Sequence, residues 1–211
     1  MEVFKFVFSP IDVNTYILAD KSGYCAIIDC GCFSEAEFER FTGFMDQKKL
    51  APVLLLNTHC HLDHIFGNKW MLEKYKLRAY CHIKEEKNRK NSIEYALFFG
   101  LTMDQPPEPE GTITDGQVIS FGTSQLLALH VPGHSPGSLA FYSKPDDIVF
   151  SGDALFEGSI GRTDLPGGDF ETLIESIRSK LLILPPATKV YPGHGDVTTI
   201  ENEIENNPFL K

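Results

Sequence analysis

Short runs of alternating or continuous apolar residues recur along the chain and predict β-strands. The first three runs are separated by Ser9-Pro10 and by the Asp20–Gly23 turn, so we expect the sheet to open with antiparallel strands. The predicted strands cover residues 3–8, 15–18, 25–29, 50–56, 78–81, 117–121, 125–131, 138–143, 147–151 and 189–191.

Apolar residues at helical spacing predict helices between some of these strands. Ser34 and Glu37 have the form of a capping box, which predicts a helix that runs to about Gln47. Asp169 is the expected N-cap of a later helix, which Pro185-Pro186 ends. The other predicted helices are 65–75, 88–100 with Ile93, Leu97, Phe98 and Phe99 inside, and at most one short helix in 197–206; residues 104–111 are a predicted surface loop.

Strands alternate with helices and no linker-like break occurs, so we expect one α/β domain over residues 1–211. The composition, 42% hydrophobic and 23% charged, is that of a soluble globular protein. The formal charge of -10 and the pI of about 5.1 argue against a nucleic-acid partner, which needs clustered Lys and Arg. The five cysteines form no C-x-x-C pair, and no signal peptide or membrane span is visible, so we expect reduced thiols, a cytoplasmic location and no membrane partner.

Candidate chemistry is concentrated in Asn57-Thr58-His59-Cys60-His61-Leu62-Asp63-His64, which follows a predicted strand. On an extended segment His59 and His61 point to the same side, and a turn into a helix can aim Asp63 and His64 at a neighbouring point. A mixed set of imidazoles and a carboxylate is typical of catalytic zinc or non-haem iron. The alternative is a polar surface loop, which does not explain why three of the seven histidines gather here.

Three further metal-type residues follow predicted strands, each directly after a glycine. They are His134 in Pro132-Gly133-His134-Ser135-Pro136-Gly137-Ser138, Asp153 in Ser151-Gly152-Asp153, and His194 in Tyr191-Pro192-Gly193-His194-Gly195. A glycine lets the backbone come close to a bound ion or to its ligands.

Together these motifs resemble the metallo-β-lactamase superfamily and, within it, the hydroxyacylglutathione hydrolase (glyoxalase II) group. The resemblance implies an α/β fold, the metallo-β-lactamase αβ/βα four-layer sandwich. It also implies two divalent metal ions, zinc in the first place with iron or manganese as alternatives. By the same resemblance, one ion is held by His59, His61 and His134, the other by Asp63, His64 and His194, with Asp153 bridging both.

The segment Gly158-Ser159-Ile160-Gly161-Arg162-Thr163-Asp164 is similar to a short glyoxalase II-like subgroup. The resemblance implies a small-molecule thioester substrate and a binuclear metallohydrolase. Arg162 is a candidate for binding a substrate carboxylate; the alternative is a salt bridge to Asp164. Full-length glyoxalase II carries a C-terminal helical domain with much of the glutathione site, whereas this sequence continues for 17 residues after His194. We therefore expect weak selectivity for the thiol half of the substrate. The oligomeric state is not predicted.

The expected chemistry is hydrolysis by a metal-bridging hydroxide, which two divalent ions make available near neutral pH. Asp63 is the expected catalytic residue, as a metal ligand and as the acceptor that orients the hydroxide. His82 and His130 are expected to have surface or hydrogen-bonding roles, and Cys60 to be a packing residue.

Two other functions remain open. Persulfide dioxygenases resemble the chain in the Thr-His-Cys-His-x-Asp-His and Gly-Arg-Thr-Asp segments and use a single iron. A non-catalytic metal-binding module is the other alternative, although a structural ion needs only four protein ligands.

Overall fold

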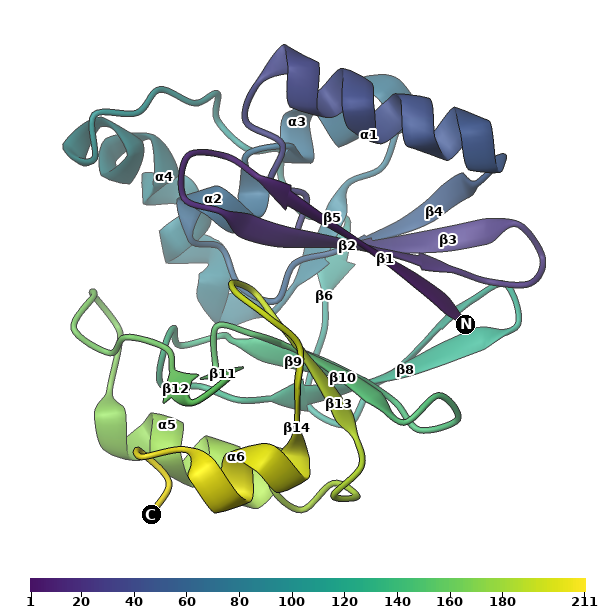
Figure 1. The fold of residues 1–211 in the computed structure, drawn as a ribbon. Helices are drawn as coiled ribbons and strands as arrows, with labels where there is room; N and C mark the ends of the chain where they lie inside the picture. Colours follow the sequence, from purple (N-terminus) through teal and green to yellow (C-terminus); the bar gives the residue numbers. More distant parts are fainter. The chain divides into compact units, whose positions relative to one another are not determined.

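The computed structural model describes residues 1–211 as two compact units. The first unit comprises Met1–Cys81, Glu86–Thr112 and Ser120–Ser124; the second comprises His82–Glu85, Ile113–Ile119 and Gln125–Lys211. The first unit is built on one six-stranded sheet and the second on another (Figure 1). The single domain expected over 1–211 stays a prediction.

The sheet of the first unit has the strand order β1-β2-β3-β4-β5-β6. Its first three strands are antiparallel, as the sequence predicts, and the strands from β3 to β6 are parallel. Parallel neighbours end at the same edge of a sheet, so the segments that follow β3 and β4 meet there. The strands are β1 (Glu2–Phe8), β2 (Val13–Ala19), β3 (Tyr24–Ile28), β4 (Ala51–Leu56), β5 (Ala79–Cys81) and β6 (Gly111–Thr112).

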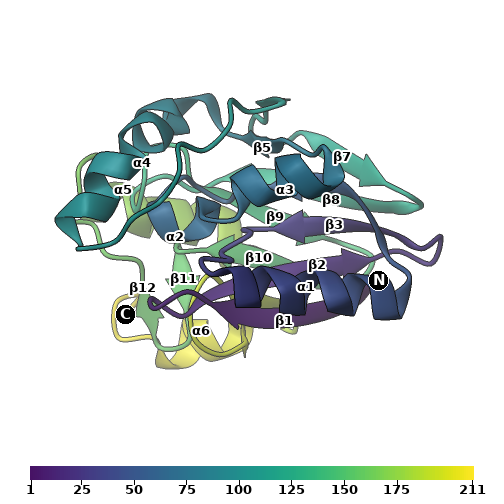
Figure 2. The same cartoon turned by 90° about the horizontal axis from the view of Figure 1, so that it is seen from above.

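Helix α1 (Glu35–Lys48) packs on this sheet and begins with the predicted capping box. Ser34 Oγ accepts a hydrogen bond from Glu37 N at 3.3 Å, and Glu37 Oε2 accepts one from Ser34 N at 3.0 Å. Phe41 and Met45 of α1 are buried in one core with apolar residues of β2, β3 and β4. Figure 2 shows α1 lying along the strands β1 and β2.

The predicted helix over 65–75 is interrupted, and this part of the prediction is wrong. Helix α2 (Leu62–Ile65) is a single turn, and α3 (Asn68–Tyr75) begins after Gly67. Gly67 N donates to Cys30 O at 2.8 Å, and a Cβ at position 67 would collide with Cys30 Sγ. This close approach of two backbones separates the two helices.

Helix α4 (Glu86–Phe98) also corrects the prediction, because the large apolar residues near its end, which were expected inside, are exposed. Leu97, Phe98 and Phe99 are 63%, 83% and 50% exposed, whereas the buried residues include Arg89 and Ala96. Arg89 is held by Glu108 Oε2 at 2.7 Å and by the carbonyl of Pro106 at 3.2 Å. These hydrogen bonds hold Arg89 against the proline-rich segment, and the face of α4 that carries Arg89 is therefore the buried one.

The sheet of the second unit has the order β14-β13-β10-β9-β8-β7. β10 and β13 are parallel, whereas β8, β9 and β10 are antiparallel in succession. The short strands β11 (Leu155–Phe156) and β12 (Ser159–Ile160) form a separate hairpin. The sheet strands are β7 (Val118–Phe121), β8 (Ser124–His130), β9 (Leu139–Ser143), β10 (Ile148–Gly152), β13 (Lys189–Pro192) and β14 (Thr198–Thr199).

Helix α5 (Phe170–Ser176) begins at the predicted N-cap, since Asp169 Oδ1 accepts from Thr172 N at 2.8 Å. It continues into a π-helical segment, Ile177–Leu181, and α6 (Ile200–Asn206) follows β14. Leu173, Ile177 and Leu181 lie in one core with residues of β8, β9, β10 and β13. None of the helices has the length and apolar content needed to cross a bilayer.

Candidate metal centre

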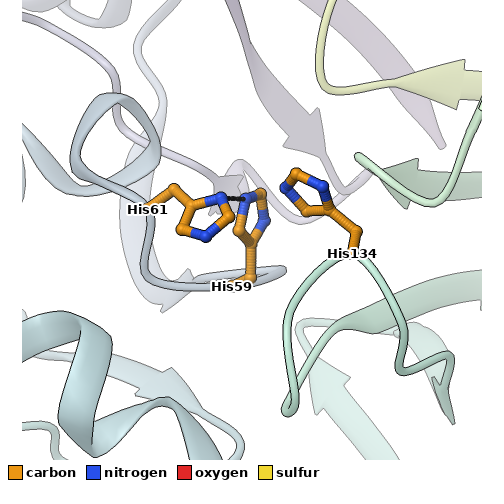
Figure 3. Close-up of side chains that lie close together, drawn as sticks. All are labelled: His59, His61 and His134. Carbon is orange, nitrogen blue, oxygen red and sulfur yellow. Dashed lines mark hydrogen bonds between the residues drawn. The ribbon is translucent and has the colours of Figure 1, made fainter. Parts of the chain in front are cut away.

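The segment after β4 carries the first set of predicted ligands. His61 is the N-cap residue of α2, and His59 lies two residues before it. The two rings face each other edge-on with centroids 4.6 Å apart, and His59 Nε2 lies 3.1 Å from His61 Nδ1 (Figure 3). The two imidazoles therefore converge, as the two-residue period predicts.

Asp63 and His64 project from the single turn of α2 and complete this set. His64 Nε2 lies 3.5 Å from Asp63 Oδ2, and the His64 ring centroid lies 4.0 Å from that of His59. His59, Asp63 and His64 are buried, and His61 is half-buried. The structure therefore brings together the four predicted ligands of the first unit.

Asp29 contacts one of the predicted ligands, and the sequence analysis missed it. It directly follows β3, is 1% exposed and has a φ of +54°. Its Oδ1 accepts from Thr58 N at 2.8 Å; its Oδ2 accepts from Thr58 Oγ1 at 2.6 Å and lies 2.9 Å from His64 Nδ1. The available signal was an aspartate at the end of the strand that neighbours the histidine-bearing one.

The contact with Asp29 determines which nitrogen of His64 faces a metal. A carboxylate next to Nδ1 favours the tautomer with the proton on Nδ1, because that N–H can then donate to it. The lone pair is left on Nε2, which is the nitrogen nearer to Asp63. Metal-binding histidines commonly have such a carboxylate behind the ring.

The second unit carries the other three predicted ligands. His134 follows β8, Asp153 follows β10, and His194 follows β13. Asp153 Oδ2 lies 3.5 Å from His134 Nε2 and 3.6 Å from His194 Nε2. The ends of β10 and β13 are joined where Gly193 N donates to Gly152 O at 2.8 Å. One carboxylate oxygen thus faces both imidazoles of this unit.

Two glycines allow the backbone to pack closely around these ligands. Gly133, directly before His134, has a φ of +126°, and a Cβ there would collide with the backbone of Leu173. A Cβ at Gly161 would collide with the carbonyl oxygen of Asp153. The glycine before His134 thus packs against Leu173 and not against another ligand, so its expected role beside a bound ion stays a prediction.

Arg162 acts on His134 through its backbone and on Asp164 through its side chain. The Arg162 carbonyl lies 2.8 Å from His134 Nδ1, which favours a proton on Nδ1 and leaves Nε2 to face Asp153. The guanidinium donates to both oxygens of Asp164, each at 2.7 Å, although both side chains are exposed. This pairing raises the pKa of Arg162 and lowers the pKa of Asp164 to about 2. The salt bridge weighed as the alternative is thus present.

The spacing of the ligands within each unit fits a metal coordination sphere. Nitrogen and oxygen ligands lie about 2.0–2.2 Å from zinc, so two ligands of a tetrahedral ion are about 3.3–3.6 Å apart. Three of the distances between ligand atoms, 3.5, 3.5 and 3.6 Å, lie in this range, and the distance from His59 Nε2 to His61 Nδ1 is slightly shorter at 3.1 Å. Imidazole and carboxylate donors suit zinc, iron and manganese. Both sets of residues therefore fit divalent metal ions, and they do not single out one metal.

The remaining candidates have the supporting roles expected of them. His82 stacks on His130 at 4.3 Å; burial, followed by the proximity of His130, lowers the pKa of His82. His130 Nε2 lies 3.0 Å from the carbonyl oxygen of Pro136. Cys60 is buried against Ile65 and takes no part in the ligand set.

Comparison with known proteins agrees with the fold and with a family of metallo-hydrolases. The family model of the metallo-β-lactamase superfamily matches residues 9–194. The probable metallo-hydrolase YqgX of Bacillus subtilis is 39% identical over 207 residues, which are 95% of this chain and 93% of that protein. The hydroxyacylglutathione hydrolase GloC of Haemophilus influenzae is 36% identical over 199 residues, 93% of this chain and 92% of that protein.

Among solved structures, TTHA1623 in a di-iron-bound form has a TM-score of 0.89 and is 38% identical, with 98% of this chain and 100% of that chain covered. This similarity over the whole chain confirms the predicted fold, and the relatives in Bacillus and Haemophilus are both named as hydrolases. The chain belongs to the metallo-β-lactamase superfamily.

Proposed function

We propose that this protein is a metal-dependent hydrolase that cleaves small hydroxyacyl thioesters. In this proposal two divalent ions are held in the arrangement of the glyoxalase II group. His59, His61 and His134 hold one ion, Asp63, His64 and His194 hold the other, and Asp153 bridges them. Zinc is the proposed metal, with iron or manganese as alternatives; iron is the metal in the similar TTHA1623 structure.

The observation that carries this proposal is the orientation of two ligand rings. His64 Nδ1 faces Asp29 at 2.9 Å, and His134 Nδ1 faces the Arg162 carbonyl at 2.8 Å. Each ring therefore has its Nδ1 turned to a hydrogen-bond acceptor, which leaves Nε2 as the nitrogen for a cation. A polar surface loop has no need for such an arrangement.

The chemistry of thioester hydrolysis suits such a site. Bound divalent ions supply an acidified water and a polarised carbonyl. Asp63, whose Oδ2 lies 3.5 Å from His64 Nε2, is positioned to accept a proton from the attacking water and to orient it. The water oxygen adds to the carbonyl carbon, so that the C–O bond forms and the carbonyl oxygen becomes an oxyanion. When the C=O bond re-forms, the C–S bond breaks and the sulfur leaves as a thiolate that requires no general acid.

The substrate class is supported by the similarity to GloC. That relative is named a hydroxyacylglutathione hydrolase and is matched over 92% of its length. A glutathione thioester is accordingly one member of the proposed class, next to hydroxyacyl esters of smaller thiols. We propose weak selectivity between these thiols.

The test is metal content together with a substrate panel. Protein purified without added metal is expected to hold two ions per chain and to cleave hydroxyacyl thioesters of more than one thiol. The panel also contains a β-lactam and a persulfide, the latter with an oxygen electrode. One iron per chain, oxygen consumption with the persulfide and no thioester cleavage would replace the proposal with the dioxygenase function.

Arg162 is proposed to bind a carboxylate of the substrate, for which it must exchange its present partner, Asp164. Arg162→Ala is expected to raise KM roughly tenfold and to change kcat little, as for a charge-assisted contact made equally in ground state and transition state. Steady-state kinetics on a hydroxyacyl thioester measures both constants.

Asp164→Asn is the matched control, because it weakens the competing partner and keeps the size of the side chain. It is expected to lower KM or to leave it unchanged. If both variants raise KM alike, the pair is a structural salt bridge and Arg162 does not bind substrate.

A further inference from the structure

Glu85 is a buried carboxylate with no place in the ligand set described above. It ends the short turn Ile83–Glu85 that follows β5, in the four-residue segment His82–Glu85 that belongs to the second unit. Its side chain is fully buried, which is rare for a glutamate unless its oxygens are hydrogen-bonded. The question is what these bonds hold in place.

Two hydrogen bonds join Glu85 to the loop that carries His134. Glu85 Oε1 accepts from Ser135 Oγ at 2.6 Å and from Gly137 N at 2.7 Å. Ser135 Oγ also lies 3.0 Å from Ser138 Oγ, and Ser138 Oγ accepts from Ser135 N at 3.3 Å. One oxygen of Glu85 thus holds Ser135 and Gly137 directly, and Ser138 is joined to it through Ser135.

The contact also explains the glycine at position 137. A Cβ on Gly137 would come within 2.8 Å of Glu85 Cγ and 2.9 Å of Glu85 Oε1. On the other side of His134, Gly133 packs against Leu173, and its carbonyl accepts from Asp169 N at 2.8 Å. The backbone of His134 is therefore held from both sides.

We propose that Glu85 is a positioning residue for the metal ligand His134. It acts through Ser135 and Gly137, fixing the loop so that the imidazole keeps Nδ1 on the Arg162 carbonyl and presents Nε2 on the side of Asp153. This inference rests on the proposed binuclear site. Glu85 lies 49 positions before His134 and is not one of the proposed metal ligands.

The test is the affinity of the metal-free protein for Zn²⁺, measured by calorimetry, with the visible absorption of Co²⁺ as a second readout. Glu85→Ala is expected to weaken one of the two binding events by about tenfold or more, in the range found when supporting groups of metal ligands are removed. The Co²⁺ spectrum is expected to change with it, because the geometry of one site is altered. Glu85→Gln is expected to stay within about threefold of the wild type, since the side-chain oxygen of glutamine can accept from both Ser135 Oγ and Gly137 N.

Two further variants separate positioning from general stability. Leu181→Ala truncates a buried residue in the core of the same unit that is not part of the loop over residues 133–138; it is expected to lower Tm and to leave the Zn²⁺ affinity unchanged. Ser135→Ala removes one of the two bonds and is expected to weaken Zn²⁺ by about threefold, which provides a test should Glu85→Ala not fold.

Wild-type affinity for both ions in Glu85→Ala, or in Ser135→Ala if the former does not fold, would overturn the inference. Equal losses in Glu85→Ala and Glu85→Gln, or in Glu85→Ala and Leu181→Ala, would also overturn it. If the wild-type protein itself binds no metal, the proposed function is wrong. That result differs from unchanged Zn²⁺ affinity in the variants, which would contradict only the role of Glu85.

Discussion

Asp153→Ala is expected to abolish metal binding at both proposed sites. Asp153 Oδ2 lies 3.5 Å from His134 Nε2 and 3.6 Å from His194 Nε2, so one oxygen serves the ligands assigned to two ions. Without it, each of the two proposed ions would lose the carboxylate that they share and the negative charge that offsets their own. Metal content is expected to fall from two ions per chain to fewer than one, and thioesterase activity by more than about 100-fold, beyond the loss typical of supporting groups. Elemental analysis of the purified variant measures the first and kinetics the second.

His82→Ala is the control for Asp153→Ala. His82 stacks on His130, and its Nδ1 accepts from Lys84 N at 3.3 Å, so its removal costs stability without removing a ligand. This variant is expected to keep both ions. Equal loss of metal in the two variants would mean that the ligands have been misassigned.

Asp29→Asn is expected to weaken metal binding while the fold is kept. The amide matches the carboxylate in shape, and asparagine tolerates the positive φ of this position. However, its NH₂ group cannot accept a hydrogen bond. If it lies next to His64 Nδ1, it favours the tautomer that carries the proton on Nε2, the nitrogen needed for the metal. The Zn²⁺ affinity is expected to fall by about 10- to 100-fold, measured by competition with a chromophoric chelator.

Asp20→Asn offers a matched comparison in the same unit. Asp20 is a buried aspartate whose oxygens accept from Ser22 N, Thr123 Oγ1 and Ser124 Oγ, and it contacts no proposed ligand. Serine and threonine hydroxyls can rotate to accept from an amide, so a modest loss of Tm and unchanged Zn²⁺ affinity are expected. The orienting role of Asp29 is contradicted if the Asn variants at 29 and 20 bind Zn²⁺ equally well.

Elements whose determining contacts are local in the sequence were predicted, and elements that depend on distant contacts were not. The capping box at Ser34 and the N-cap at Asp169 were readable because the partners lie three residues apart. Strand positions were also predictable, because the apolar runs that indicate them are continuous in the sequence. The predicted helix over 65–75 failed because its break at Gly67 depends on Cys30, which lies 37 residues earlier in the sequence. Likewise, the buried face of α4 depends on a bond from Arg89 to Glu108.

The sequence by itself determined the chemical types of the proposed ligands and their order, because imidazoles and a carboxylate gathered at strand ends have few uses other than binding a metal. Only the tertiary structure decided which groups orient those ligands. Asp29 lies 35 residues from His64, Glu85 lies 50 residues from Ser135, and the Arg162 carbonyl lies 28 residues from His134. A hydrogen bond of this kind is set by which strand ends and turns fold next to one another, and neither periodicity nor spacing along the chain carries that information.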